Sequence, residues 1–150
     1  MGTRSHWRPV FVLLLANLQR DEMGHLATHV LVVDDDLDVL TVLVAMLNDS
    51  GFVTTAVDGA VAMRDMLSGK GVPIDVIVLD CQMPGEPLAQ LALHAKALRF
   101  PVVMISGNWE AMNFALENGL QLLPKPFRIA DLLIAISEAM SSGEFGQRDA

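Results

Sequence analysis

The sequence contains no tyrosine, a single cysteine and only 10 lysine or arginine residues in a chain of 150. Because Cys81 has no second cysteine to pair with, a disulfide framework is excluded, as is any zinc site built from several thiolates. The 18 aspartates and glutamates outnumber the basic residues and give a formal net charge of −8. Since phosphate backbones repel an acidic chain, we expect no direct binding to nucleic acid.

The amino-terminal segment lacks an apolar run that could span a bilayer. Its apolar stretch, Val10–Leu15, has six residues, whereas a transmembrane helix needs about 20. Arg4 and Arg8 precede this stretch, as in a signal peptide, but the residues after it make a poor cleavage site. The alternatives are a signal peptide, a short appended helix, and an upstream extension of a start at Met23. We predict an extension over residues 1–28, a helix or a disordered segment, with no membrane association and a cytoplasmic location.

The rest of the chain has the composition of a folded domain, with 52% hydrophobic and 19% charged residues. From residue 30 onward, apolar runs typical of strands alternate with segments of helical spacing. Strands are expected at Val30–Val33, Phe52–Val57, Ile74–Leu79, Val102–Ile105 and Leu120–Leu123, and helices at Leu37–Leu47, Gly59–Leu67, Pro87–Leu98, Trp109–Glu117 and Ile129–Met140.

This alternation predicts a parallel sheet with helices on both faces. The predicted fold class is α/β, a (βα)5 flavodoxin-like three-layer sandwich with strand order 2-1-3-4-5. The domain is expected over residues 29–142, and residues 143–150 are expected to form a flexible polar tail.

Polar residues follow four of the five predicted strands, at the edge of the sheet where such folds bind ligands. Clustered carboxylates need a cation, and a few hard oxygen ligands suit Mg²⁺. A carboxylate can act as a nucleophile and form an aspartyl phosphate, while an ammonium and a hydroxyl group bind the phosphoryl oxygens. The arrangement therefore predicts phosphoryl transfer. The residues concerned are Asp34, Asp35 and Asp36, then Asp80, Ser106 and Lys125.

Four strings carry a resemblance to a known family: residues 29–36 (HVLVVDDD), 76–85 (VIVLDCQMPG), 102–107 (VVMISG) and 124–127 (PKPF). In this order on a (βα)5 pattern, they resemble the receiver domain of two-component response regulators, over about residues 29–141.

The resemblance implies a role for each of these polar residues. Asp80 would be the phosphoacceptor, Ser106 the switch hydroxyl and Lys125 the phosphate-binding lysine. Asp34 and Asp35 would be the acidic pair. The same resemblance implies that Mg²⁺ is bound by Asp34, Asp35, Asp80 and the backbone carbonyl of Gln82, and that the Lys125–Pro126 peptide is cis.

The family further implies a phosphorylated signalling module of a phosphorelay, with no enzymatic activity beyond self-phosphorylation and slow autodephosphorylation. The implied phosphodonor is a histidine kinase or a histidine phosphotransfer protein. Since no basic effector segment follows, we expect a stand-alone receiver that signals through protein contacts. The family's usual contact surface is the fourth helix, fifth strand and fifth helix, and homodimers are compatible with it.

The sequence departs from the family at the switch. Leu122 occupies the position three residues before the lysine, where the family usually has tyrosine or phenylalanine. The interval from Ser106 to Lys125 is also short, so we expect a trimmed or irregular fourth helix. Without an aromatic ring to move, we predict that phosphorylation shifts an order–disorder balance over Gly107–Gly119.

Two other functions fit parts of the pattern. In a haloacid-dehalogenase-type phosphohydrolase, Asp36 and Asp38 would form the nucleophile motif, but the second acidic pair of that family is missing after Lys125. A receiver that serves only as a non-phosphorylated scaffold is the other alternative, and the complete set of site residues argues against it.

Several residues near these motifs also have simpler interpretations. Asp36 and Asp38 favour the start of a helix. Cys81 is expected to be packed in the core and His94 to be a surface residue. Trp109 is expected either in the core or as an exposed anchor on a partner surface.

Overall fold

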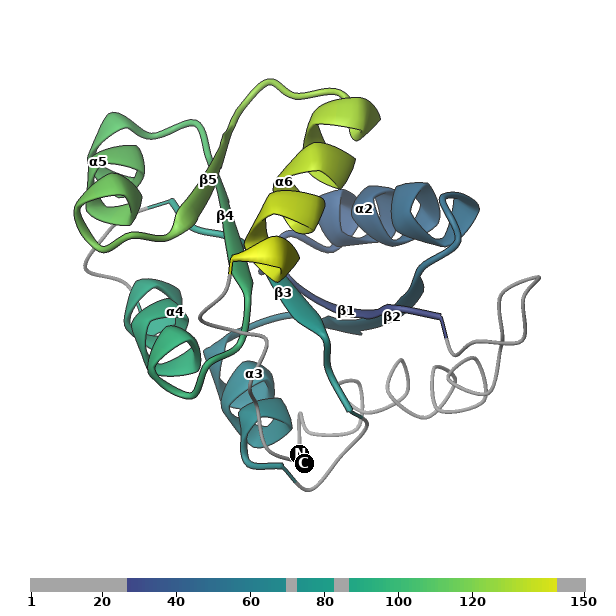
Figure 1. The fold of residues 1–150 in the computed structure, drawn as a ribbon, viewed down its shortest axis with the longest axis horizontal. Coiled ribbons are helices and arrows are strands. Elements are labelled where there is room, and N and C mark those ends of the chain that lie inside the picture. Colours follow the sequence, from purple (N-terminus) through teal and green to yellow (C-terminus); the bar gives the residue numbers. More distant parts are fainter. Residues whose placement is uncertain (1–26, 70–72, 83–86, 143–150) are drawn as a thin grey trace. The chain divides into compact units, whose positions relative to one another are not determined.

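The computed structural model describes residues 27–69, 73–82 and 87–142. Strands and helices alternate along this part of the chain (Figure 1). The strands form one parallel sheet in the order β2-β1-β3-β4-β5, which confirms the predicted fold class and strand order. The elements are β1 (His29–Val33), α2 (Leu37–Asp49), β2 (Val53–Val57), α3 (Ala60–Leu67), β3 (Val76–Asp80), α4 (Pro87–Ala97), β4 (Val102–Ser106), α5 (Trp109–Glu117), β5 (Gln121–Pro124) and α6 (Ile129–Ser141).

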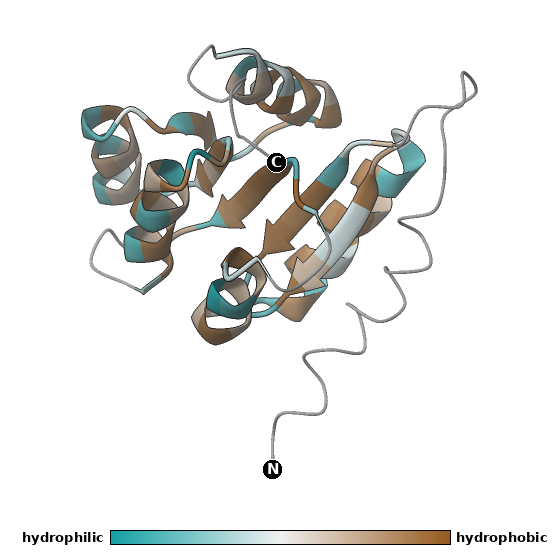
Figure 2. Ribbon diagram, turned by 60° about the horizontal axis from the view of Figure 1, so that its bottom comes forward, coloured by the Kyte–Doolittle hydropathy of each residue, from teal (hydrophilic) through white to brown (hydrophobic). Residues whose placement is uncertain are grey.

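The strands are buried and consist mostly of apolar residues, with Thr54 and Thr55 in the middle of β2 as polar exceptions. Every residue of β1, β2, β3 and β4 is buried, as expected for strands of a parallel sheet that is covered on both faces. Figure 2 shows this as mostly hydrophobic strands beside helices of mixed character. At the end of the sheet, β5 is only half-buried.

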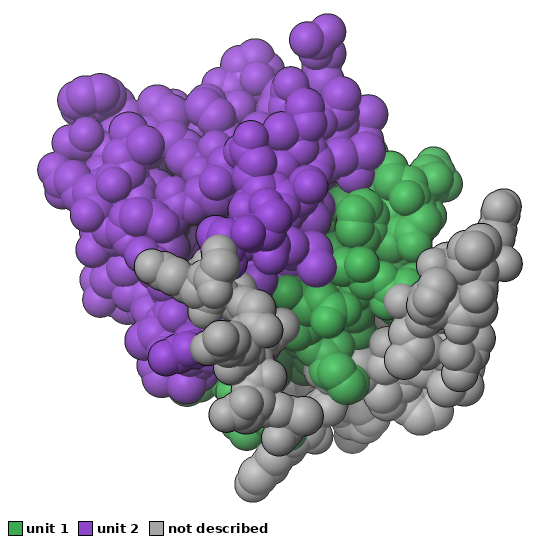
Figure 3. All heavy atoms as spheres, viewed as in Figure 1, with its two compact units in different colours: residues 1–75 green, residues 76–150 purple. Residues whose placement is uncertain are grey.

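The chain divides into two compact units, residues 1–75 and residues 76–150 (Figure 3). In unit 1, β1 and β2 pair in parallel from His29 opposite Val53 to Val33 opposite Val57. The helix α2 packs on both strands and buries Leu40, Leu43 and Leu47, which lie on one face because they are three and four residues apart.

In unit 2, β4 is paired in parallel with β3 on one side and β5 on the other. The helices α4 and α5 lie on one side of β4 and β5, and α6 lies on the other (Figure 1). The apolar face of α6 is fully or almost fully buried and consists of Leu132, Ala135, Ile136 and Ala139. This packing fixes the ends of β3, β4 and β5, which carry the candidate site.

The element boundaries differ from the prediction by at most two residues. The clearest difference is β3, which begins at Val76 and not at Ile74. Asp75 precedes the strand and is a polar residue that bonds to the backbone of His29. Its Oδ2 accepts a hydrogen bond of 2.8 Å from the backbone N–H of His29, and its own N–H donates to the carbonyl of His29.

Parts of the predicted organisation cannot be compared with the described residues. Residues 1–26 of the expected extension and the expected tail over residues 143–150 lie outside them. Within the described ranges, no helix is long and apolar enough to cross a membrane.

Candidate functional site

Asp80 is the last residue of β3, and only 2% of its side chain is exposed. The strand is apolar up to this residue, so the carboxylate is drawn into the buried end of the strand by the packing of its neighbours. In the register of the sheet, Asp80 lies opposite Ile105 of β4. An ionised carboxylate at such a depth needs charged or hydrogen-bonding partners.

Both oxygens of the Asp80 carboxylate have a partner in unit 2. Lys125 Nζ forms an ion pair with Oδ2, and Gln82 Nε2 donates a hydrogen bond of 2.7 Å to Oδ1. These two contacts compensate the burial of the charge, because each places a donor on an oxygen that has lost water. The predicted proximity of Asp80 and Lys125 is thereby confirmed.

Lys125 directly follows the edge strand β5. Its backbone N–H donates a hydrogen bond of 2.9 Å to the carbonyl of Ser106, so the chain at Lys125 is held to the end of β4. The Lys125–Pro126 peptide is cis, as the resemblance implied. The lysine side chain is 32% exposed, which leaves part of it accessible to solvent.

Ser106 is the last residue of β4 and is fully buried. Its Oγ accepts a hydrogen bond of 3.0 Å from the backbone N–H of Asn108. Asn108 in turn begins α5, because its Oδ1 accepts hydrogen bonds from the backbone N–H groups of Glu110 and Ala111. The hydroxyl of Ser106 is therefore connected through Asn108 to the first turn of α5.

The acidic residues after β1 belong to unit 1 and differ in burial. Asp34 is 3% exposed, and its Oδ1 accepts a hydrogen bond of 2.9 Å from the backbone N–H of Asp36. Asp35 is exposed. Asp36 is exposed and caps α2, since its Oδ1 accepts from the N–H groups of Asp38 and Val39. The cap supports the structural interpretation of Asp36 and gives no support to a nucleophile at that position.

The donor set predicted for a metal consists entirely of hard oxygen atoms, which fits Mg²⁺ and not a softer transition metal. Asp35 is exposed and could exchange water for a metal ion, while the oxygens of Asp80 are engaged by Lys125 and Gln82. Within the described ranges, no group of three or more histidine, cysteine, aspartate or glutamate residues is arranged to hold a metal ion. The support for Mg²⁺ therefore comes from the chemical type of the donor atoms, which are all hard oxygens.

The residues with simpler interpretations behave largely as expected. Cys81 is fully buried, and its N–H donates to the carbonyl of Ile105 as part of the packed end of the sheet. His94 is exposed on α4. Trp109 is 71% exposed at the start of α5, which excludes the core alternative for this side chain. Leu122, at the position of the usual aromatic residue, is half-buried in β5.

A model of the response regulator receiver domain matches residues 30–137, which is more than half of the chain. This chain belongs to the response regulator receiver domain family. It is therefore a receiver domain of the two-component type, and the haloacid-dehalogenase alternative is not favoured.

Several curated proteins that this receiver domain resembles are named as transcriptional regulators. The chain is 39% identical over 122 residues to the transcriptional regulatory protein PrrA of Mycobacterium tuberculosis, covering 77% of this chain and 51% of PrrA. It is 34% identical over 113 residues to Protein PetR of Rhodobacter capsulatus, covering 73% of this chain and 47% of PetR. The chain spans about half the length of the curated relatives that it matches.

Solved structures have the same fold. A response regulator receiver protein from Sinorhizobium medicae is 32% identical, with a TM-score of 0.62, over 77% of this chain and 96% of that one. Full-length FixJ from B. japonicum is 30% identical, with a TM-score of 0.65, over 75% of this chain and 57% of that one.

Sequence reasoning missed two contacts at the site. The first is the side chain of Gln82 on Asp80, because only its backbone carbonyl was considered. The second is the hydrogen bond from Asn108 to Ser106. The pair Asn108 and Glu110 after a strand end gave a signal for the helix cap, since asparagine is a favoured capping residue and acidic residues favour the first turn. No sequence signal identified the Gln82 contact.

Proposed function

We propose that the receiver takes a phosphoryl group onto Asp80. The observation that carries this proposal is the ion pair between Asp80 and Lys125 at the ends of β3 and β5. The buried carboxylate of Asp80 can act as a nucleophile. The partly exposed ammonium of Lys125 lies beside it and can bind the oxygens of the incoming phosphoryl group.

In the proposed reaction, a carboxylate oxygen of Asp80 forms a bond to phosphorus while the bond from phosphorus to the donor breaks. The leaving group of the donor, the imidazole nitrogen of a phosphohistidine, keeps the electron pair and takes up a proton. Lys125 exchanges its contact with the free carboxylate for one with a phosphoryl oxygen. The hydroxyl of Ser106 donates to another phosphoryl oxygen.

Asp34, Asp35, Asp80 and the backbone carbonyl of Gln82 are the residues that would hold Mg²⁺. When bound, the ion supplies positive charge that offsets the repulsion between the carboxylates and the phosphoryl group. Asp35 is exposed and Asp34 is buried and hydrogen-bonded. We therefore assign Asp35 the role of the outer ligand, which exchanges most readily with water.

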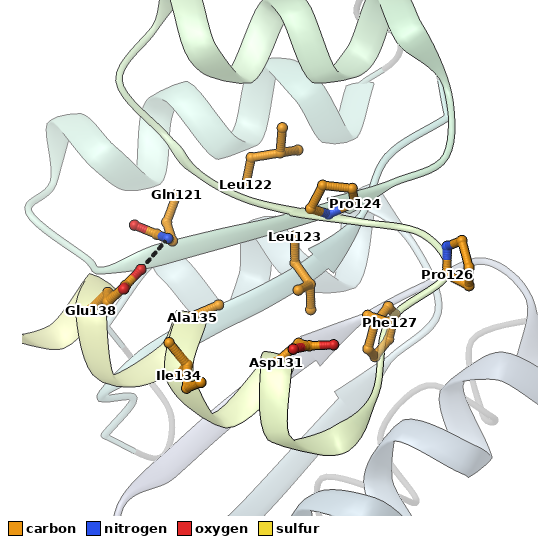
Figure 4. A pocket seen from close by; sticks show the side chains of 10 residues that line it. All are labelled: Gln121, Leu122, Leu123, Pro124, Pro126, Phe127, Asp131, Ile134, Ala135 and Glu138. Carbon is orange, nitrogen blue, oxygen red and sulfur yellow. Dashed lines mark hydrogen bonds between the residues drawn. The ribbon is translucent and has the colours of Figure 1, made fainter.

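The proposed partners are a histidine kinase or histidine phosphotransfer protein as donor and a downstream protein as target. Within unit 2, apolar side chains are exposed on α5 (Trp109 and Leu116) and on α6 (Ile134), and they support a protein contact through these helices. A groove of about 360 Å³ also lies between β5 and α6, with Leu122, Leu123 and Phe127 in its lining (Figure 4). A second copy of the chain could use the same surface.

Incubation with a small-molecule phosphodonor and Mg²⁺ tests the proposal. We expect one acid-stable, base-labile phosphate per chain, and none in Asp80→Asn. The matched control is Asp65→Asn, which removes an exposed carboxylate from α3 and should be labelled like the wild type. Full labelling of Asp80→Asn would refute the assignment.

A further inference from the structure

The two ends of α5 are held by different parts of unit 2. At the start of the helix, Asn108 connects it to Ser106 at the end of β4. At the other end, Lys96 Nζ donates a hydrogen bond of 2.8 Å to the carbonyl of Asn118, the C-cap residue. Lys96 lies in the last turn of α4, 22 positions away in the sequence. The contact therefore joins two helices that both pack against β4 (Figure 1).

The ammonium of Lys96 matches the electrostatics of a helix end. The last carbonyl groups of a helix have no partner within the helix, and together they give this end a partial negative charge. The last turn of α5 contains no basic residue and ends with the exposed Glu117, whose charge has the unfavourable sign there. Lys96 of α4 therefore supplies the positive charge that the sequence of α5 does not provide.

Gly119 provides the room for this contact. A Cβ atom at this position would lie 2.7 Å from Lys96 Nζ, a separation that real Cβ atoms essentially never show. The residue also has a φ of 66°, in the left-handed region that glycine adopts without strain. Asn118 adds a second restraint, because its Nδ2 donates a hydrogen bond of 2.8 Å to the carbonyl of Phe114. The end of α5 is thus fixed by contacts that do not involve the candidate site.

We propose that Lys96 is a positioning residue that holds the end of α5 on α4 while the start of α5 responds to phosphorylation. Movement of the Ser106 hydroxyl toward a phosphoryl group removes the acceptor of the Asn108 N–H, which acts on the first turn of the helix. Lys96 is not part of the candidate site, so its contact with Asn118 is retained. The helix then opens from its start and stays fixed at its other end. The inference rests on the proposed phosphorylation of Asp80 and adds the part of α5 that transmits it.

Substitutions of Lys96 separate its charged group from the packing of its side chain. Lys96→Met keeps a long unbranched side chain and removes the ammonium. Lys96→Arg restores a positive charge and several N–H donors, so it is the conservative variant that should recover the contact. Arg64→Met is the matched control, because it removes a positive charge from an exposed residue in the last turn of another helix, α3. An effect that comes only from the change in net charge would appear in this control as well.

Hydrogen exchange resolved by residue, on the full chain, tests the proposal. Without any phosphoryl mimic, we expect the amides of residues 118–120 to exchange about fivefold faster in Lys96→Met. The same amides should exchange at wild-type rates in Lys96→Arg and Arg64→Met. With beryllofluoride and Mg²⁺, the wild type should lose protection at residues 109–112 and keep it at residues 118–120. In Lys96→Met, both ends of α5 should lose protection.

The outcomes distinguish this proposal from the function on which it rests. Unchanged exchange of residues 118–120 in Lys96→Met would overturn the role of Lys96, as would an equal increase in Arg64→Met or a failure of Lys96→Arg to restore protection. Loss of protection at both ends of α5 in the wild type with the mimic would also overturn it. If the mimic changes no part of the wild type, or Asp80→Asn is still labelled by a phosphodonor, the proposed function fails. The exchange without the mimic then still decides whether Lys96 holds the end of α5.

Discussion

The backbone N–H of Asn108 donates a hydrogen bond of 3.0 Å to the side-chain oxygen of Ser106. The same asparagine caps α5 through its side chain, so one residue connects the end of β4 to the first turn of the helix. If Ser106 turns its hydroxyl toward a phosphoryl group, Asn108 loses this acceptor. The helix start then changes its hydrogen bonding without the movement of an aromatic ring.

Hydrogen exchange tests this coupling. We predict that a phosphoryl mimic at Asp80, such as beryllofluoride with Mg²⁺, changes the protection of residues 107–119. The helix α5 has only nine residues, and a helix of this length depends on its cap and its packing. High protection of this segment that stays unchanged, while other parts of the sheet respond, would contradict the prediction.

Removal of the Ser106 hydroxyl, the acceptor of the hydrogen bond from Asn108, should reproduce part of the change in protection. In Ser106→Ala the N–H of Asn108 can no longer donate to the Ser106 hydroxyl oxygen, and we expect lower protection at the start of α5 even without the mimic. Ser68→Ala is a suitable control, because its hydroxyl also makes a local hydrogen bond, to the carbonyl of Asp65 at the end of α3. Equal hydrogen exchange at the start of α5 in Ser106→Ala and Ser68→Ala would argue against a specific role for Ser106.

The buried histidine at the start of β1 predicts a dependence of stability on pH. Burial lowers the pKa of His29 below 6.5, and the carboxylate of Asp75 and a backbone hydrogen bond at Pro73 oppose this shift only in part. The ring shares a hydrogen bond of 2.6 Å with Oγ1 of Thr55. Because the unfolded chain binds the proton more readily, the free energy of unfolding should fall as the pH drops below about 6.5.

Chemical denaturation between about pH 5 and about pH 8, the range over which histidine side chains change their charge, measures this effect. His29→Gln should show a weaker dependence on pH than the wild type. His94→Gln, which replaces an exposed histidine on α4, should keep the wild-type dependence. If the wild type and His29→Gln lose stability in parallel as the pH falls, other groups cause the decrease.

Magnesium should stabilise the folded receiver. A ligand that binds only the folded state at about 100 times its Kd adds about 2.7 kcal/mol to the free energy of unfolding. We predict a rise in Tm with Mg²⁺ that is reversed by a chelator and lost in Asp35→Ala. Asp49→Ala, at the exposed end of α2, is the control and should retain the gain. An unchanged response in Asp35→Ala would place the metal elsewhere.

Sequence periodicity predicted the fold closely, because the strands of this parallel sheet are mostly apolar runs and the helices carry apolar residues at regular spacing. The helix Trp109–Glu117 has the predicted limits, since Asn108 caps its start and Asn118 ends it. Prediction failed at Ile74 and Asp75, where an apolar residue beside the strand suggested that β3 begins earlier. The side chain of Asp75 bonds to the backbone of His29, which lies 46 positions away, and no local pattern contains that contact.

The sequence predicted which residues make up the candidate site, but it predicted only some of the contacts between them. Asp80 and Lys125 each follow a predicted strand of the parallel sheet, which indicated that they meet, and they do. The amide of Gln82 could not be predicted, because the orientation of an exposed side chain depends on its rotamer and not on its place in a pattern.

The most direct test of the account is to identify the residue that carries the phosphoryl group. Treatment of the phosphorylated protein with borohydride reduces an aspartyl phosphate to homoserine, which peptide mass spectrometry locates. We predict a single homoserine at position 80, dependent on both the phosphodonor and Mg²⁺. Homoserine at Asp34, Asp35 or another carboxylate, with Asp80 unmodified, would contradict the account.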